Sequence, residues 1–455
     1  MSPSAPLTRR RAGVLLHPTS LPSGTLADTQ RWLDFMAAAH LGVWQMLPLG
    51  IPQHGLSPYQ CLSAFAVNPK LYPAIAPLPQ GEPLPEEFHT FCQRHHYWLD
   101  DYALFALTKQ QRQQQPWYQW PPELRDREPA TLHLLTERHQ DALIRLKWEQ
   151  FQLHQQWQQL RAEAQQRDIL LFGDMPIFVA HDSVDVWAHR DEFLLDRDGM
   201  PSVVTGVPPD YFSVTGQRWG NPHFNWEAMR DNRFHWWRQR IHTQLDWFDI
   251  VRIDHFRGLE AVWVIDANCD TAIDGYWQPV PGDEMLQQIL NDLGDNPPLV
   301  AEDLGVITDK VRALKEQFQL PGMSVLQFSF DAFEDNPHKP PNIPVNATAY
   351  TGTHDNDTTR GWFDTLDGAT QNHIRENLAM SDGDDIVTAL ITTTLNTAAT
   401  LAIVPMQDWL GLGSEARMNT PGTTENNWRW HLHDSQLTPE LSQWIATQIE
   451  KSHRG

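Results

Sequence analysis

The sequence predicts an α/β fold, a single (β/α)8 TIM barrel with subdomain insertions in the loops after its second and third strands. Three observations favour it. Eight short apolar runs are spread along the 455 residues, helical patterns separate several of them, and two of the connections are unusually long. An open doubly wound sheet is the alternative, but such a sheet is expected to carry a glycine-rich phosphate turn, and the sequence contains neither GxGxxG nor GxxxxGK[ST].

The eight apolar runs have the length and the β-branched content of strands that are buried on both faces, as in a parallel sheet. Many of them end in a polar or charged residue. In chain order, the predicted strands cover residues 12–17, 43–48, 169–175, 249–254, 299–303, 323–329, 347–354 and 401–409.

Helical patterns lie between several of these strands. Residues 28–40 and 308–318 begin with an Asp and a Thr, which are favourable N-cap residues. Residues 137–167 carry leucines mostly three or four positions apart, and residues 384–400 precede the eighth strand. Because strands and helices alternate, the pattern predicts βα units and a parallel sheet.

Two loops are long enough to hold subdomains. About 120 residues separate the second and third strands and about 70 separate the third and fourth, and connections of that length are usually functional insertions. We expect one catalytic unit over residues 1–455, with insertions at residues 50–165 and 176–247. The second insertion contains GVPPDYFSVTGQRWGNP at residues 206–222, in which Gly and Pro flank several aromatic residues.

Composition excludes several classes of protein. A net charge of −23 disfavours a nucleic-acid partner, and 41% hydrophobic residues disfavour a disordered chain. The three cysteines, Cys61, Cys92 and Cys269, show no CxxC spacing, so a disulfide scaffold is not expected. The short apolar run after the N-terminal arginines is no export signal, and no segment resembles a membrane span, so we expect a cytoplasmic protein with no membrane partner.

The 20 Trp residues suggest flat apolar faces with a polar edge, which suit sugar rings, although most aromatic residues serve packing. Carboxylates also stand at five predicted strand ends, where the active sites of parallel barrels lie. They are Asp174, Asp254, Glu302 with Asp303, Asp355, and Asp408, the last of which we expect to be structural.

Such a cluster of like charges suits either a divalent metal or a pair of carboxyls that cleaves a glycosidic bond. The Trp content and the lack of a phosphate loop favour the sugar. Arg252 also favours a site for sugar chemistry. Residues two apart on a strand face the same side, so its guanidinium can hold Asp254 ionised. We expect no metal and no cofactor, since the histidines show no HxxxH or HExxH pattern.

Eight longer segments resemble the 4-α-glucanotransferases (amylomaltases, or disproportionating enzymes) of glycoside hydrolase family 77. They span nearly the whole chain in order, and several exceed ten residues. The segments are GVLLHPTSLPSG at 13–24, SPYQCLSAFAVNP at 57–69, GDMPIFVAHDSVDVWA at 173–188, GVPPDYFSVTGQRWGNP at 206–222, VRIDHFRG at 251–258, AEDLGVIT at 301–308, GTHDNDTTRGW at 352–362 and QDWLGLGSEARMNTPGTTENNW at 407–428.

The resemblance implies a (β/α)8 barrel that transfers a segment of an α-1,4-glucan to the 4-hydroxyl of another glucan or of glucose, by retaining double displacement. It implies that Asp254 is the nucleophile, Glu302 the general acid and base, and Asp355 the carboxylate that binds sugar hydroxyls in the transition state. The expected partners are maltooligosaccharides and α-1,4-glucans. The sequence does not select an oligomeric state.

The resemblance also implies substrate-binding residues around the trio. Arg252, His354 and Asp174 line the subsite of the cleaved sugar, and Tyr59, with Ser57 in the same SPYQ motif, forms a stacking platform. In residues 206–222, which look like the family's active-site flap, the acceptor-side candidates are Asp210, Gln217 and Trp219. Asp303 either contacts the acceptor or orients Glu302.

Two alternatives are an α-1,4-glucan hydrolase with the same trio and a catalytically weak glucan-binding protein. The flap segment disfavours the first, and the presence of all three carboxylates disfavours the second. Four positions depart from the family's usual pattern, and they leave the sugar contacts near them open: His54, Leu56, Asn426 and His431.

Overall fold

The computed structural model describes residues 6–79, 81, 83–209, 213–294 and 296–455. Its centre is an eight-stranded parallel sheet in the order β10-β11-β12-β1-β2-β3-β6-β9. The strands are β1 (Arg11–Leu15), β2 (Val43–Gln45), β3 (Leu170–Met175), β6 (Ile250–Ile253), β9 (Leu299–Ala301), β10 (Gly322–Val325), β11 (Ala347–Tyr350) and β12 (Leu401–Pro405). All eight predicted strands are therefore present.

The sheet curls until its two edge strands meet, and the contact between β9 and β10 closes it into a barrel. The backbone N–H of Ala301 donates to the carbonyl of Pro321 over 2.8 Å. The backbone N–H of Met323 donates to the Asp303 carboxylate over 2.7 Å. We call this contact the seam. The predicted (β/α)8 barrel is confirmed.

The two faces of the strands fill two separate layers. Side chains that point into the barrel form a closed core, which includes Leu15, Val43, Phe172, Ile250, Val300, Val325 and Ile403. Their neighbours along the strands point outward and pack against the surrounding helices, as Val14, Trp44, Leu171 and Val404 do. Because both faces are buried, the strands read as continuous apolar runs.

Helices surround the sheet. The chain forms α1 (Thr29–Ala38), α2 (Glu86–Arg94), α3 (His96–Gln111), α4 (Pro122–Arg125), α5 (Pro129–Arg138), α6 (Gln140–Gln166), α7 (Val184–Ala188), α8 (Trp226–Asp231), α9 (His235–Trp247), α10 (Gly282–Leu293), α11 (Asp309–Gln317), α12 (Thr359–Asp364), α13 (Gly368–Asn377), α14 (Ile386–Asn396), α15 (Met406–Trp409) and α16 (Pro439–Lys451). The four predicted helices correspond to α1, α6, α11 and α14. Residues 326–346, between β10 and β11, contain short 3-10 turns in place of an α-helix.

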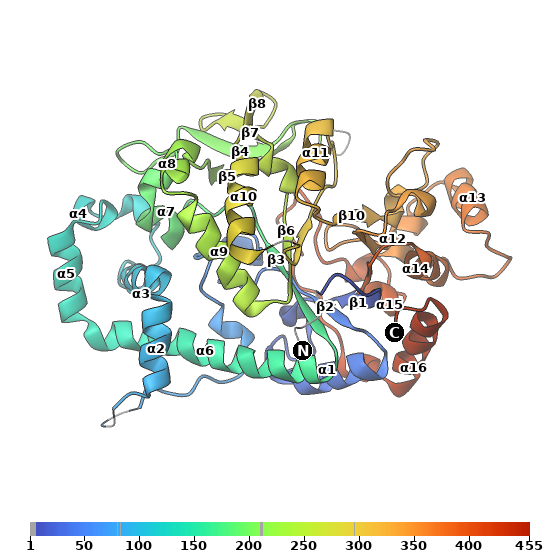
Figure 1. Ribbon diagram of the computed structural model, residues 1–455, viewed down its shortest axis with the longest axis horizontal. Helices are drawn as coiled ribbons and strands as arrows, with labels where there is room; N and C mark the ends of the chain where they lie inside the picture. Colours follow the sequence, from blue (N-terminus) through green and yellow to red (C-terminus); the bar gives the residue numbers. More distant parts are fainter. Residues whose placement is uncertain (1–5, 80, 82, 210–212, 295) are drawn as a thin grey trace.

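The long connection after β2 contains α2 to α6. In Figure 1, α2 to α5 stand out on one side of the barrel and α6 runs back to its base. A buried ion pair between Lys109 on α3 and Asp182, in the loop after β3, ties this segment to the barrel. Asp182 also accepts a hydrogen bond from the backbone N–H of Trp117, and its carbonyl accepts one from Gln53.

A second, antiparallel sheet covers one side of the barrel's mouth, and the sequence did not predict it. Its order is β5-β4-β7-β8, from β4 (Val203–Val207), β5 (Gln217–Pro222), β7 (Ala261–Asp266) and β8 (Gly275–Pro279). The two ends of the segment 206–222, expected to be a flap loop, thus belong to the paired strands β4 and β5 (Figure 1). The sheet depends on pairing between β4 and β7, which are far apart in sequence, so no local pattern reveals it.

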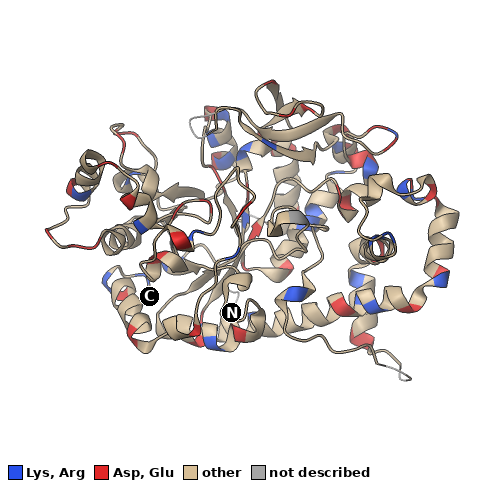
Figure 2. Ribbon diagram, turned by 180° about the vertical axis from the view of Figure 1, so that it is seen from behind, with Lys and Arg blue, Asp and Glu red and all other residues tan. Residues whose placement is uncertain are grey.

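Acidic and basic residues both occur over the outer helices and loops (Figure 2). Among the described residues, no helix is both long and apolar enough to span a bilayer.

One buried cation joins the end of the chain to the base of the barrel. The Arg454 guanidinium donates to the carbonyls of Leu395, Thr397, Thr400 and Arg11 over 2.6 to 3.3 Å. These carbonyls precede or begin β12 and β1, so the contact fixes the starts of two neighbouring strands.

We expect Arg454→Ala to lower the free energy of unfolding by about 3 kcal/mol, because it leaves several buried carbonyls with fewer partners. Urea unfolding followed by tryptophan fluorescence measures the change. Arg197→Ala is the matched control, since the Arg197 side chain is 93% exposed. A loss no larger than that of the control would show that the contact does not stabilise the barrel.

Candidate active site

The carboxyl ends of the strands bring the predicted trio together. Asp254 directly follows β6, Glu302 directly follows β9, and Asp355 lies in the loop after β11. Several predicted strands extend too far, because their last polar residues already belong to the loops. Asp174 differs, since it lies within β3. Neighbouring strands therefore place their carboxyls around one point, where barrel enzymes have their active sites.

The Arg252 guanidinium lies between two of these carboxylates. Its Nη1 atom contacts both oxygens of Asp174, over 2.7 and 2.8 Å, and its Nη2 atom lies 2.9 Å from Oδ1 of Asp254. Arg252 and Asp174 are buried, whereas the Asp254 side chain is 27% exposed. Asp254 is thus accessible from the mouth of the barrel and held from behind by a cation, as expected from residues two apart on one strand.

Backbone groups fix the Glu302 carboxylate. Oε2 accepts a hydrogen bond from the N–H of His255 over 2.7 Å, and Oε1 accepts one from the N–H of Leu304 over 3.0 Å. His255 adopts a left-handed backbone conformation with φ of 53°, which is uncommon for a residue with a side chain. This turn aims its N–H at Glu302, so the residue after Asp254 links the two carboxyls.

Burial raises the pKa of both carboxyls. Burial raises the pKa of Asp254 against the opposing charge of Arg252, and Asp174 adds to the rise. Burial also raises the pKa of Glu302, again against Arg252. Since like charges this close disfavour double ionisation, the pair holds one proton near neutral pH. The contact between Asp254 and Arg252 favours the proton on Glu302.

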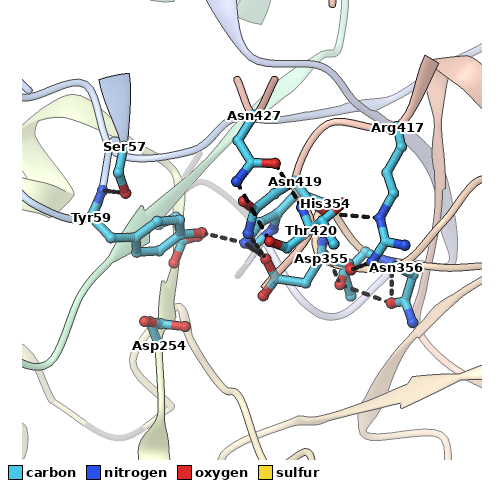
Figure 3. A network of polar contacts seen from close by, with 12 residues as sticks. Ser57, Tyr59, Asp254, His354, Asp355, Asn356, Arg417, Asn419, Thr420 and Asn427 are labelled. Carbon is cyan, nitrogen blue, oxygen red and sulfur yellow. Dashed lines mark hydrogen bonds and ion pairs between the residues drawn. The ribbon is translucent and has the colours of Figure 1, made fainter. Parts of the chain in front are cut away.

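A chain of polar contacts runs from Asp174 through Tyr59 and His354 to Asp355, and Figure 3 shows its last three members. The Tyr59 hydroxyl donates to Asp174 over 2.6 Å and lies 2.9 Å from Nε2 of His354, which is 3.4 Å from Oδ1 of Asp355. The Tyr59 and His354 rings stack with centroids 5.3 Å apart, and Trp428 lies beside both. Burial lowers the pKa of His354, so its ring is neutral here.

The flap hairpin reaches the catalytic carboxyls through one aromatic contact. The Trp219 indole packs edge-on against the His255 ring, with centroids 4.8 Å apart, and its N–H donates to the Gln217 side chain over 3.2 Å. The structure therefore places Trp219 against the residue that follows Asp254, with Gln217 hydrogen-bonded to it. Asp210, the third flap candidate, lies outside the described residues.

Two other candidates have local partners. The Asp303 carboxylate accepts the N–H of Met323 at the seam and pairs with Lys315 over 2.5 Å, so the structure does not bring it to the trio. The Ser57 hydroxyl accepts a hydrogen bond from the N–H of Tyr59 over 3.4 Å, which supports the turn that carries the tyrosine ring.

Asp408, which we expected to be structural, accepts three hydrogen bonds from Thr351 and Thr359. The donors are both hydroxyls and the N–H of Thr359, over 2.6 to 2.7 Å. The side chain thus ties the segment after β11 to α15, in agreement with the expectation.

Three departures from the family pattern have distinct settings. Asn426 has φ of 63°, a left-handed conformation that Asn tolerates better than most residues, so it can replace a glycine there. Leu56 also has a positive φ, of 61°, and lies half exposed at a turn. The His431 ring lies against Gly24, where a β-carbon would come within 3.3 Å of it. The backbone of His54 belongs to the same short 3-10 turn as Leu56.

Two residues that the sequence did not predict contact Asp355. The Asn419 side chain donates to Oδ1 of Asp355 over 2.6 Å, and the Arg417 guanidinium donates to the carbonyl of Asp355 over 2.8 Å (Figure 3). Both belong to the family-like segment at 407–428, which was the only sequence signal for them. In the described part of the chain, no group of three His, Cys, Asp or Glu side chains is arranged to hold a metal ion.

Three carboxyls around one point at the mouth of a (β/α)8 barrel, two of them with raised pKa values, define a class of protein: a barrel enzyme that acts on glycosidic bonds by acid and base chemistry. Comparisons with known proteins identify its family. The family model described as 4-alpha-glucanotransferase matches residues 15–81 and 76–438. The chain belongs to this family and is a 4-α-glucanotransferase.

Individual relatives agree. The chain is 43% identical to a 4-alpha-glucanotransferase of Synechocystis, over 96% of each protein. It is 41% identical to that of Thermus thermophilus, over 98% of this chain and 99% of the relative. Among solved structures, an amylomaltase from Streptococcus agalactiae in complex with acarbose aligns with a TM-score of 0.92 at 31% identity, covering 98% of this chain and 100% of that one.

We expect Tyr59→Phe to lower kcat/KM by about 10- to 100-fold, because the variant keeps the ring but loses the hydroxyl that joins Asp174 to His354. Initial rates with maltotriose measure the change. Tyr276→Phe is the matched control, since this tyrosine is 58% exposed on β8. Equal rates for both variants would show that the hydroxyl does not organise the site.

Proposed function

We propose that this 4-α-glucanotransferase works by double displacement, with Asp254 as nucleophile and Glu302 as acid and base. In the first step, a carboxylate oxygen of Asp254 attacks the anomeric carbon of an α-1,4-linked glucose. Glu302 gives its proton to the glycosidic oxygen, which leaves as the 4-hydroxyl of the released chain. The donor segment is then held as a covalent ester on Asp254.

In the second step, the 4-hydroxyl of an acceptor glucan or of glucose attacks the same carbon. Glu302 removes the proton of that hydroxyl, and the bond to Asp254 breaks. Two inversions restore the α configuration, so the product is again an α-1,4-glucan. The carboxyls of Asp254 and Glu302 thus return to their starting protonation states.

The other contacts support these roles. Arg252 stabilises the carboxylate that must attack, and the shared proton gives Glu302 an acid form near neutral pH. Asp355, with His354 beside it, is 47% exposed and accessible to sugar hydroxyls. Arg252, Asp174 and Tyr59 form the wall behind the cleaved sugar.

Transfer requires that an acceptor glucan, rather than water, reaches the ester. The flap hairpin favours transfer because Trp219, hydrogen-bonded to Gln217, packs against His255 next to Asp254 and offers an aromatic face there for an acceptor sugar. This contact is the observation that favours transfer over the alternative of hydrolysis with the same trio.

The proposed substrates are maltooligosaccharides and α-1,4-glucans, in keeping with the acarbose complex of the Streptococcus agalactiae amylomaltase. Residues 1–455 act as one catalytic unit in this proposal, and the insertions at 50–165 and 176–247 supply Tyr59 and the flap. Three free cysteines fit a reducing cytoplasm.

Incubation with maltotriose tests the reaction. We expect a ladder of longer maltooligosaccharides together with glucose, resolved by anion-exchange chromatography. Products no longer than the substrate would instead establish hydrolysis.

We expect Asp254→Ala to lose on the order of 10^4-fold in kcat, as loss of a member of a catalytic unit does. Asp309→Ala, whose side chain is fully exposed, is the control, and full activity of Asp254→Ala would contradict the nucleophile assignment.

We expect a bell-shaped dependence of kcat/KM on pH. A carboxyl with a raised pKa keeps its proton to higher pH, so the singly protonated pair persists above the pH range in which ordinary carboxyls ionise, and activity falls on the alkaline side as its last proton leaves. On the acid side, activity falls as the second carboxyl gains a proton. A rate that stays flat from about pH 4 to about pH 9 would contradict this assignment of the pair.

A further inference from the structure

The three carboxyls of the site are held in different ways. Asp254 contacts a buried guanidinium, and Glu302 accepts two backbone N–H groups of nearby turns. Asp355 lies in a loop, and its side chain is 47% exposed, against 27% for the side chain of Asp254. An exposed carboxylate in a loop needs added contacts to keep one orientation.

A loop from elsewhere in the chain supplies these contacts. After β12 and α15, the chain returns over the mouth of the barrel, and Asn419 donates to Oδ1 of Asp355 over 2.6 Å. Arg417 donates to the carbonyl of Asp355 over 2.8 Å and to the carbonyl of Asn419, also over 2.8 Å. These three hydrogen bonds close a ring that holds both the side chain and the backbone of Asp355 (Figure 3).

The loop that carries this ring is itself anchored. Asn427 is buried, accepts the N–H of Thr420 over 3.0 Å and donates to the carbonyl of Thr423 over 2.9 Å. Arg417 lies 4.0 Å from the Asp357 carboxylate, which also accepts the Ser414 hydroxyl over 2.7 Å. Asn419 therefore presents its amide from a fixed position.

The contacts leave one face of the carboxylate free. Asn419 and the His354 ring both approach Oδ1. In the described part of the chain, Oδ2 of Asp355 accepts no hydrogen bond from the protein. This division assigns Oδ1 to the protein and leaves Oδ2 for sugar hydroxyls.

We infer that Asn419 and Arg417 are positioning residues that act on the reaction through Asp355. The inference rests on the proposed role of Asp355 as the carboxylate that binds sugar hydroxyls in the transition state. Neither residue transfers a proton or forms a bond with the substrate. Their contribution is to hold Asp355 in the geometry that the distorted sugar ring needs, where an error of about 1 Å costs about 10^2-fold in rate.

A double-mutant cycle tests the inference. The donor is maltotriosyl fluoride, because fluoride leaves without help from Glu302 and slow variants stay measurable. Asn419→Ala should lower kcat by about 10- to 100-fold, while KM changes less than about threefold. In an Asp355→Asn background, Asn419→Ala should cost less than about threefold more, because residues that act as a unit are not additive. Asn377→Ala on α13 is the matched control, since its side-chain hydrogen bonds among the described residues go to His373 of the same helix.

Two further variants separate positioning from folding. Arg417→Lys keeps the charge but cannot make both hydrogen bonds of the planar guanidinium, and it should lower kcat in the same direction. Asn419→Asp has nearly the same shape but places a second carboxyl against Oδ1 of Asp355. This new carboxyl can donate a hydrogen bond to Oδ1 only when it is protonated. Its rate relative to wild type should rise as the pH falls, a response that a loss of stability alone does not produce.

Each outcome bears on a separate claim. Full kcat for Asn419→Ala, or losses that multiply in the double variant, would overturn the inference while the role of Asp355 stands. Full activity for Asp355→Asn would overturn the proposed role of Asp355 itself.

Discussion

The site depends on one guanidinium that two carboxylates share. Arg252 is buried, and burial of a cation is costly unless anions surround it. Nη1 of Arg252 donates to both carboxylate oxygens of Asp174, and Nη2 contacts the carboxylate of Asp254. Removal of the cation would leave the buried carboxylate of Asp174 and the partly exposed carboxylate of Asp254 to repel each other, so the arrangement of the mouth of the barrel follows from this contact.

Segments far apart in the sequence are joined around that centre. Tyr59 comes from the loop after β2, the flap from the loop after β3, and Asn419 from the loop after β12. The Gln60 side chain hydrogen-bonds Asn221 of β5 over 3.3 Å, so the segment that carries Tyr59 also touches the flap hairpin. Asn221 in turn donates to the carbonyl of Val179 over 2.8 Å, which ties both to the loop after β3.

The sequence predicted what local patterns encode. Buried parallel strands are continuous apolar runs, so all eight appeared, and Arg252 with Asp254 followed from the side-chain period of a strand. The hairpin β4–β5 and its pairing with β7 were missed, because the register depends on partners distant in sequence. Asn419 and Arg417 were missed for a related reason: polar residues in a loop look like ordinary surface until the fold places them beside Asp355. The carboxylate of Asp303 turned to the seam, although its neighbour Glu302 faces the site.

That seam has a consequence for how activity is acquired during folding. Glu302 directly follows β9, at one edge of the sheet, and the carboxylate of the next residue, Asp303, accepts the N–H of Met323 on β10, at the other edge. A chain with seven correct strand pairings but an open seam would keep most of its apolar core. Its general acid, Glu302, would then follow an edge strand that lacks its contact with β10. Such a chain would show much of the native fluorescence without enzyme activity, because only closure of the seam completes the surroundings of Glu302.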